Sequence, residues 1–152
     1  MRKLFILTLI FLFTACNFTQ KRSEIHSFSN QVWNKFESVT FVQQFDEKCK
    51  LEMKLKALLR TDYEYADLKL QYEWISPDGE SKLNYVTLAL MNEKGEKVLA
   101  NKDGFLEVEA VISKKEFVNS PGKYTLIVDN MMPQYNTNSV VSLNLELNVS
   151  DY

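Results

Sequence analysis

"CKLEMKLKALLR", residues 49–60, alternates apolar and polar side chains along most of its length. The apolar residues take the odd positions: Cys49, Leu51, Met53, Leu55 and Ala57. The first four even positions are charged: Lys50, Glu52, Lys54 and Lys56. Only a strand places two such sets on opposite faces, because a helix would mix them. The stretch therefore predicts a half-buried antiparallel strand, with Cys49 as a small buried hydrophobe rather than a nucleophile.

The C-terminal run, residues 141–149, repeats this alternation, and shorter runs of the same kind lie between the two. These predicted strands cover residues 39–45, 68–75, 83–91, 97–101, 106–112 and 124–130. Several breaks carry a glycine, as turns often require: "SPDGES", "NEKGEK", "NKDG" and "NSPGK". Strands at this spacing predict an all-β fold, a two-layer antiparallel β-sandwich of about seven or eight strands, Ig-like or jelly-roll-like. We expect "SKKEFVNSPGKYTL", residues 113–126, to contain a polar bend before the last hairpin.

The N-terminus has the layout of a secretory signal. Two basic residues precede an apolar run, residues 4–13, which two small residues and then Cys16 follow. The run is about half of the ~20 residues that a membrane-spanning helix needs, so we predict that residues 1–15 are a signal peptide that is removed. A cysteine directly after the small pair resembles the lipobox of bacterial lipoproteins. That resemblance implies cleavage before Cys16 and a diacylglyceryl group on its sulfur.

The mature chain is predicted to contain a single domain. Residues 16–36 are polar with scattered apolar positions, and we interpret them as a lipidated N-terminus and a tether that docks through Trp33, Phe28 and Phe36. The single β-sandwich domain is expected over residues 37–152.

The residues after Cys16 also bear on location. Asn17 stands where enteric lipoproteins that stay at the inner membrane carry Asp, which favours the outer membrane. Surface-exposed lipoproteins of the Bacteroidetes tend to carry an acidic cluster here, whereas "NFTQKRSE" offers only Glu24 beside two basic residues. We therefore expect a lipid-anchored protein of the outer membrane that faces the periplasm.

Charge and composition argue against several classes of site. Without residues 1–15 the chain has 16 basic and 20 acidic residues, and this net charge of −4 predicts no attraction to nucleic acid or to an anionic bilayer. His26 is the single histidine, and we place it in the tether, so no catalytic triad or histidine metal site is expected in the domain. With Cys16 acylated, no intramolecular disulfide can form. An oxygen-rich calcium site around Asp62, Glu64 and Asp67 lacks a spaced ligand loop, and we expect no catalytic residue, metal or cofactor.

Aromatic and sulfur-containing side chains are the strongest candidates for a contact surface. Tyr72 and Trp74 share parity with an apolar stripe, so we predict that they belong to the core or its rim. The segment before that strand holds Arg60, Tyr63 and Tyr65, where a loop could present them to a partner or pack them over the end of the sandwich. The late segment "NMMPQYNTN", residues 130–138, offers adaptable apolar contacts or a cap on the core: Met131, Met132 and Tyr135.

Four stretches in order carry a resemblance: "VWNKFESVTF", "LLRTDYEYADLKLQYEWISPDG", "VTLALMNEKGE" and "SPGKYTLIVDNMM". From Trp33 to Val149 the chain resembles the gliding-motility lipoprotein family of the Bacteroidetes, the GldH type. It departs from the family pattern at Met132, where the family commonly has Arg, and at Asp67, where it favours Asn.

The resemblance implies a non-catalytic outer-membrane lipoprotein associated with the gliding machinery and the secretion system coupled to it. Its expected partners are the membrane, through the N-terminal lipid, and envelope proteins of these machineries, with no nucleic acid and no small-molecule ligand. The alternative is a glycan-binding module of a polysaccharide-uptake system, which requires coplanar exposed aromatic rings. An envelope hydrolase would require a cleft with converging carboxylates.

Overall fold

The computed structural model describes residues 19–152, so the predicted signal peptide and Cys16 lie outside the described residues. The described chain is nearly all β-structure. Its strands are β1 (Gln20–Ser27), β2 (Val32–Asn34), β3 (Val39–Phe45), β4 (Cys49–Arg60), β5 (Asp67–Ile75), β6 (Ser81–Ala89), β7 (Phe105–Val118), β8 (Gly122–Asn130), β9 (Asn136–Asn138) and β10 (Val140–Asp151). A short 3-10 turn, η1 (Ser29–Gln31), joins β1 to β2.

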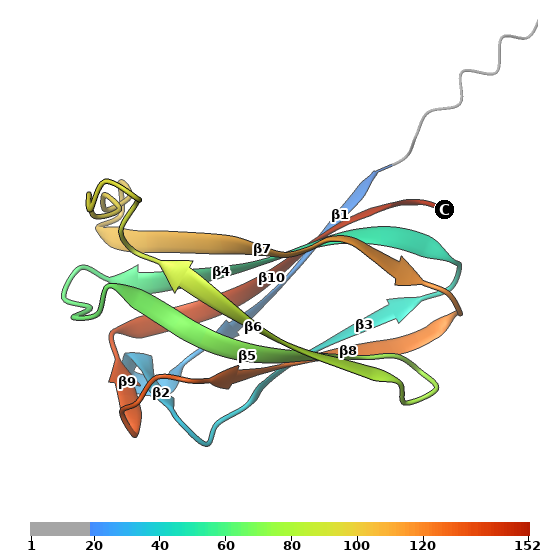
Figure 1. Cartoon of the computed structure of the whole chain (residues 1–152), viewed down its shortest axis with the longest axis horizontal. Helices are drawn as coiled ribbons and strands as arrows, with labels where there is room; N and C mark the ends of the chain where they lie inside the picture. The colour runs from blue at the N-terminus through green and yellow to red at the C-terminus, as the bar shows by residue number, and fades with distance from the viewer. Residues whose placement is uncertain (1–18) are drawn as a thin grey trace, which may run out of the picture.

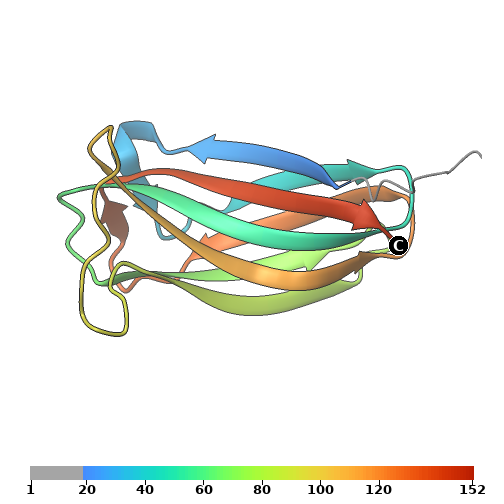
Figure 2. The same cartoon turned by 90° about the horizontal axis from the view of Figure 1, so that it is seen from above.

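Two antiparallel sheets face each other and form the predicted two-layer sandwich (Figures 1 and 2). One sheet has the order β1-β10-β4-β7 and the other β3-β8-β5-β6, so eight of the described strands build the two layers. The small ribbon of β2 and β9 lies at one end. The prediction of an antiparallel β-sandwich is therefore confirmed.

The core lies between the sheets and is built by the predicted alternation. Leu55 of β4 pairs with Leu145 of β10, and both side chains are fully buried between the layers. Tyr72 and Trp74 of β5 are buried too, as their parity predicts. Cys49 is buried, and burial raises the pKa of its thiol, which confirms it as a small hydrophobe of the core.

Residues 20–34 belong to the folded domain, which corrects the predicted tether over residues 16–36 and the domain start at residue 37. β1 pairs with β10 over its whole length, from Gln20 opposite Val149 to Ser27 opposite Ser142. The sequence pattern does not predict β1, because β1 is an edge strand whose inward positions are polar: Arg22, Glu24 and His26. Inward-pointing charge is a known device for protecting sheet edges.

These polar side chains join the edges of the two sheets. Arg22 donates from Nη1 to the carbonyl oxygen of Gln44 in β3 at 2.8 Å. Gln43 donates to Glu24 Oε2 at 2.7 Å. His26, predicted to lie in the tether, belongs to β1, and its ring lies 4.9 Å from that of buried Phe28. Polar contacts between β1 and β3 thus close this side of the sandwich.

Two further predictions differ from the structure. Residues 97–101 form only isolated bridges to neighbouring segments, not a strand. The first residues of the predicted polar bend, 113–118, belong to β7, which continues to Val118. The pairing of β7 with β4 shifts register on both sides of Met53, where two bulges in β7 each contain an extra residue. These extra residues break the apolar–polar alternation of the sequence.

The sandwich is elongated, and its two ends carry different segments (Figure 1). The entry end, as we call it, is where β1 begins and β10 ends, beside the starts of β4 and β8. The far end is the opposite one, with the connections at residues 61–66, 90–104 and 131–135 and the β2–β9 ribbon. The predicted contact residues all lie at the far end.

Candidate protein-contact surface at the far end

Arg60, the last residue of β4, anchors a polar network on the surface of the far end. Its Nε donates to Asp62 Oδ1 at 3.1 Å and its Nη1 donates to Gln31 Oε1 at 3.2 Å. Ser139 also donates to Asp62 Oδ1, at 2.7 Å. Half of the Arg60 side chain is exposed, but two of its donors already bind Asp62 and Gln31 of the chain itself.

Ser139 and Arg60 hold the pKa of the exposed Asp62 carboxyl below its usual value, the Ser139 hydrogen bond contributing most. A carboxyl whose pKa is lower in the folded state than in the unfolded state stabilises the protein at pH values above its unfolded pKa of about 4. This stabilisation disappears as the pH falls through the folded pKa. We expect Asp62→Asn, which keeps an oxygen for Ser139 but removes the charge, to flatten the fall in stability below about pH 4. Urea-unfolding midpoints measured over this acid range check it, and identical pH profiles for both proteins would contradict it.

Tyr63 is not presented to a partner, which corrects its assignment as an exposed contact residue. Its side chain is 2% exposed, and its hydroxyl donates to the carbonyl oxygen of Asp67 at 2.9 Å. Burial raises the pKa of this hydroxyl far above its usual value. The ring packs edge to face on half-buried Tyr65 at 5.4 Å. The pair therefore packs over the sandwich end, the second of the two arrangements that the sequence allows.

Met132 is likewise buried, at 3% exposure, and caps the core instead of extending into solvent. Its sulfur accepts a hydrogen bond from the backbone N–H of Lys69 at 3.4 Å. Its own N–H donates to Asn130 Oδ1 at 2.9 Å. The two hydrogen bonds of Met132, through its sulfur and its N–H, fix the chain just after the end of β8.

Asn130 is the centre of a buried polar network that the sequence pattern does not reveal. Its side chain is 1% exposed, and its Nδ2 donates to the carbonyl oxygen of Trp33 at 3.2 Å and to Thr137 Oγ1 at 2.8 Å. Trp33 lies in β2 and Thr137 in β9, opposite each other. One amide thus ties the β2–β9 ribbon to the end of β8.

Next to this hydrogen-bonded base lies an exposed aromatic pair, Phe36 and Tyr135. Their rings meet edge to face at 5.6 Å, and 78% and 60% of the two side chains are exposed. The backbone holds them together, because Lys35 N–H donates to the Tyr135 carbonyl oxygen at 2.8 Å. Met131 is also exposed in the same loop. The prediction that Phe36 helps to dock a tether is wrong, because its side chain is exposed. It lies in an irregular segment, where strand parity does not indicate burial.

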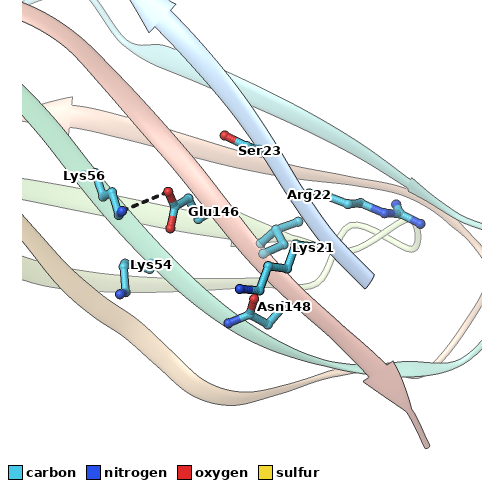
Figure 3. A pocket seen from close by; sticks show the side chains of 8 residues that line it. Lys21, Arg22, Ser23, Lys54, Lys56, Glu146 and Asn148 are labelled. Carbon is cyan, nitrogen blue, oxygen red and sulfur yellow. Dashed lines mark ion pairs between the residues drawn. The ribbon is translucent and has the colours of Figure 1, made fainter. Parts of the chain in front are cut away.

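A second surface of interest is a hollow of about 450 Å³ on the outer face of the β1-β10-β4-β7 sheet (Figure 3). Four cationic residues line it with one carboxylate, that of Glu146: Lys21, Arg22, Lys54 and Lys56. Lys56 Nζ lies 3.0 Å from Glu146, and this contact raises the pKa of Lys56. Arg22 extends away toward β3, as its hydrogen bond to Gln44 requires. The hollow offers cations to an anion, and the hydroxyl of Ser23 at its edge donates to Asn144 Oδ1 at 2.9 Å.

The rings that could have formed a sugar-binding row do not form one in the part of the chain that the structure describes. Tyr63, Tyr72 and Trp74 are buried. The exposed Phe36 and Tyr135 rings are inclined at 70° to each other, so they make no flat platform. Within residues 19–152, no group of three or more potential metal-ligating side chains gathers at one place.

No helix among the described residues is long and apolar enough to cross a membrane.

A comparison with known families matches residues 20–147 to the model of the GldH lipoprotein family. The match covers most of the chain and includes β1 through most of β10. No curated protein matches the chain.

Proposed function

Because the chain belongs to the GldH lipoprotein family, we propose that it is a non-catalytic lipoprotein that supports gliding motility or the secretion machinery coupled to it. A lipid on Cys16 anchors it in the outer membrane, facing the periplasm, and it acts by binding envelope proteins of these machineries. The contact surface is the far-end aromatic pair, Phe36 and Tyr135, together with Met131.

The exposure of this aromatic pair is the observation that carries the proposal. Large side chains at this exposure lose apolar hydration when a partner covers them, and aromatic anchors dominate the energetics of many interfaces. The pair sits on a base held by buried Asn130 and Trp33, so little conformational entropy is lost on binding. Such a preorganised pair is suited to protein contact.

Its position at the far end also fits an anchored adaptor. Only three steps of chain separate Cys16 from Thr19, the first described residue, and they reach at most ~11 Å. The entry end is therefore held near the membrane, and the far end extends away from it. Anchoring in one plane raises the effective concentration of the protein for partners in the same membrane.

A crosslinked pull-down from the native envelope tests the proposal. The lipidated protein and a Cys16→Ala form are compared, and mass spectrometry identifies the proteins that copurify. We expect gliding or secretion-system components with the anchored form only. Polysaccharide-uptake proteins or bound glycan in their place would support the glycan-binding alternative and overturn the adaptor.

We predict that the double variant Phe36→Ala and Tyr135→Ala weakens binding of the identified partner by roughly 30-fold, the effect of losing one interface hot spot. Folding stability should change little, because both side chains are exposed. Binding of purified proteins by calorimetry, beside urea unfolding, measures the two effects separately.

Tyr85→Ala is the matched control, since Tyr85 is 68% exposed on β6, outside the far-end loops. We expect it to bind as the wild type does. If Tyr85→Ala lost binding while the double variant kept it, the contact would lie on the β3-β8-β5-β6 sheet and the far-end proposal would be wrong.

A further inference from the structure

A groove rich in lysine opens where the entry end meets the outer face of the β1-β10-β4-β7 sheet. Four lysines from three strands line it with one carboxylate, Glu52, and with Thr19: Lys21, Lys50, Lys114 and Lys115. It shares Lys21 and Asn148 with the hollow of Figure 3, so the two form one continuous basic surface. We call the part of this surface that is lined by the four lysines named above the lysine groove.

A bulge in β7 explains why two successive lysines reach the same groove. Leu51 of β4 pairs with Glu116, but Met53 pairs with Ser113, so Lys114 and Lys115 together stand opposite Glu52. In a regular strand they would point to opposite faces, whereas a bulge re-aims one of them. The same bulge interrupts the apolar–polar alternation, so the sequence predicts a strand only over residues 106–112.

These lysines are available for an external anion. Among the described residues, none of the four lies within the 4.0 Å of a carboxylate that defines an ion pair. The one carboxylate in the groove, Glu52, accepts a hydrogen bond from Asn148 at 3.4 Å. Lys54 and Lys56 in the adjoining hollow are, in contrast, paired with glutamates.

Two aromatic side chains stand beside the groove. The Phe117 ring lies 5.7 Å from that of exposed Tyr152. Lys115 Nζ lies 5.2 Å from the centroid of the first ring and Lys50 Nζ 5.5 Å from that of the second. A tyrosine ring next to lysines is a combination that proteins place at the level of lipid headgroups, and Phe117 adds apolar surface beside it.

We propose that the lysine groove binds the anionic phospholipid headgroups of the membrane that holds the lipid of Cys16. The inference rests on the lipid anchor of the proposed function. Thr19 lines the groove itself, and three steps of chain reach at most ~11 Å, so an acylated Cys16 holds this edge of the groove about one Debye length, ~10 Å, from the headgroups. The net charge of −4 predicts no attraction to an anionic bilayer, but a net charge does not reveal that basic side chains gather on one face.

The test uses the lipidated mature protein in vesicles of phosphatidylethanolamine with phosphatidylglycerol, and the same protein in detergent. Acetylation rates of single lysines are followed by mass spectrometry. We expect Lys21, Lys50, Lys114 and Lys115 to react roughly tenfold more slowly on these vesicles than in detergent. Lysines of the far-end loop serve as internal controls that should not change: Lys94, Lys97 and Lys102.

Neutral vesicles and matched charge variants separate headgroup binding from simple crowding at a surface. Protection should fall in neutral phosphatidylcholine and at high salt, where charges are screened. Lys50→Glu, Lys114→Glu and Lys115→Glu together should abolish protection of Lys21, whereas Lys94→Glu, Lys97→Glu and Lys102→Glu, with the same charge change, should not.

The outcomes also distinguish this inference from the proposed function. A lipidated protein whose groove lysines react equally on vesicles and in detergent, or equally on neutral and anionic vesicles, would overturn the groove alone. A mature protein whose intact mass contains no acyl lipid would overturn the anchor and the groove together.

Discussion

A mature chain shortened to begin at Glu37 is expected not to fold. It lacks β1, so β10 loses the partner that it pairs with from Val149 to Ser142. It also lacks Trp33, which is fully buried with its Nε1 donating to the Glu37 carbonyl oxygen at 2.7 Å. Truncating such a buried aromatic side chain costs about 3–5 kcal/mol, and buried Phe28, stacked 4.7 Å from it, costs a similar amount.

These losses reach the whole stability of an ordinary domain, about 5–15 kcal/mol. Circular dichroism and urea unfolding check the result, with a chain that begins at Thr19 as the control that should fold. A cooperative transition in the shorter chain, with an unchanged dependence on urea, would mean that residues 19–36 are a separate tether after all.

The strands that the sequence predicts well are those with one apolar face. Residues 39–45 become β3 with the same bounds, and the alternation of residues 49–60 becomes β4. β1 shows the limit of that method, since its inward side chains cover the edge of the core with polar groups that bond across to β3. The pattern of β1 taken alone is that of a polar segment, and only its partner β10 makes it a strand.

The far end could be predicted only in part, for a related reason. Loop residues have no parity, so nothing local distinguishes buried Tyr63 from exposed Tyr135. What separates them is the tertiary environment: the hydroxyl of Tyr63 meets a backbone carbonyl over the sandwich end, whereas Tyr135 stands on the outside of a loop. The role of Asn130 is hidden in the same way, because it continues the inward face of β8 after Val128 with a polar side chain.

The second large effect is expected at that residue. Asn130→Ala leaves the Trp33 carbonyl, the Thr137 hydroxyl and the Met132 N–H without the hydrogen-bond partner that Asn130 gives each of them. A buried polar group that loses its partner costs about 1–3 kcal/mol, so we expect Asn130→Ala to lower the free energy of unfolding by about 3 kcal/mol or more. Thr137→Val removes only one of these bonds and should cost about 1 kcal/mol.

Asn130→Ala should also weaken partner binding under conditions in which the protein is still folded. The amide holds the β2–β9 ribbon and the loop after β8 in place, and the aromatic pair stands on both, so its loss disorders Phe36 and Tyr135 without removing them. Calorimetry at low temperature measures this, with Thr137→Val as the milder comparison. If Asn130→Ala lost stability but bound its partner as tightly as the wild type, the rigidity of the far end would have no part in recognition, and the contact would depend on the exposed side chains alone.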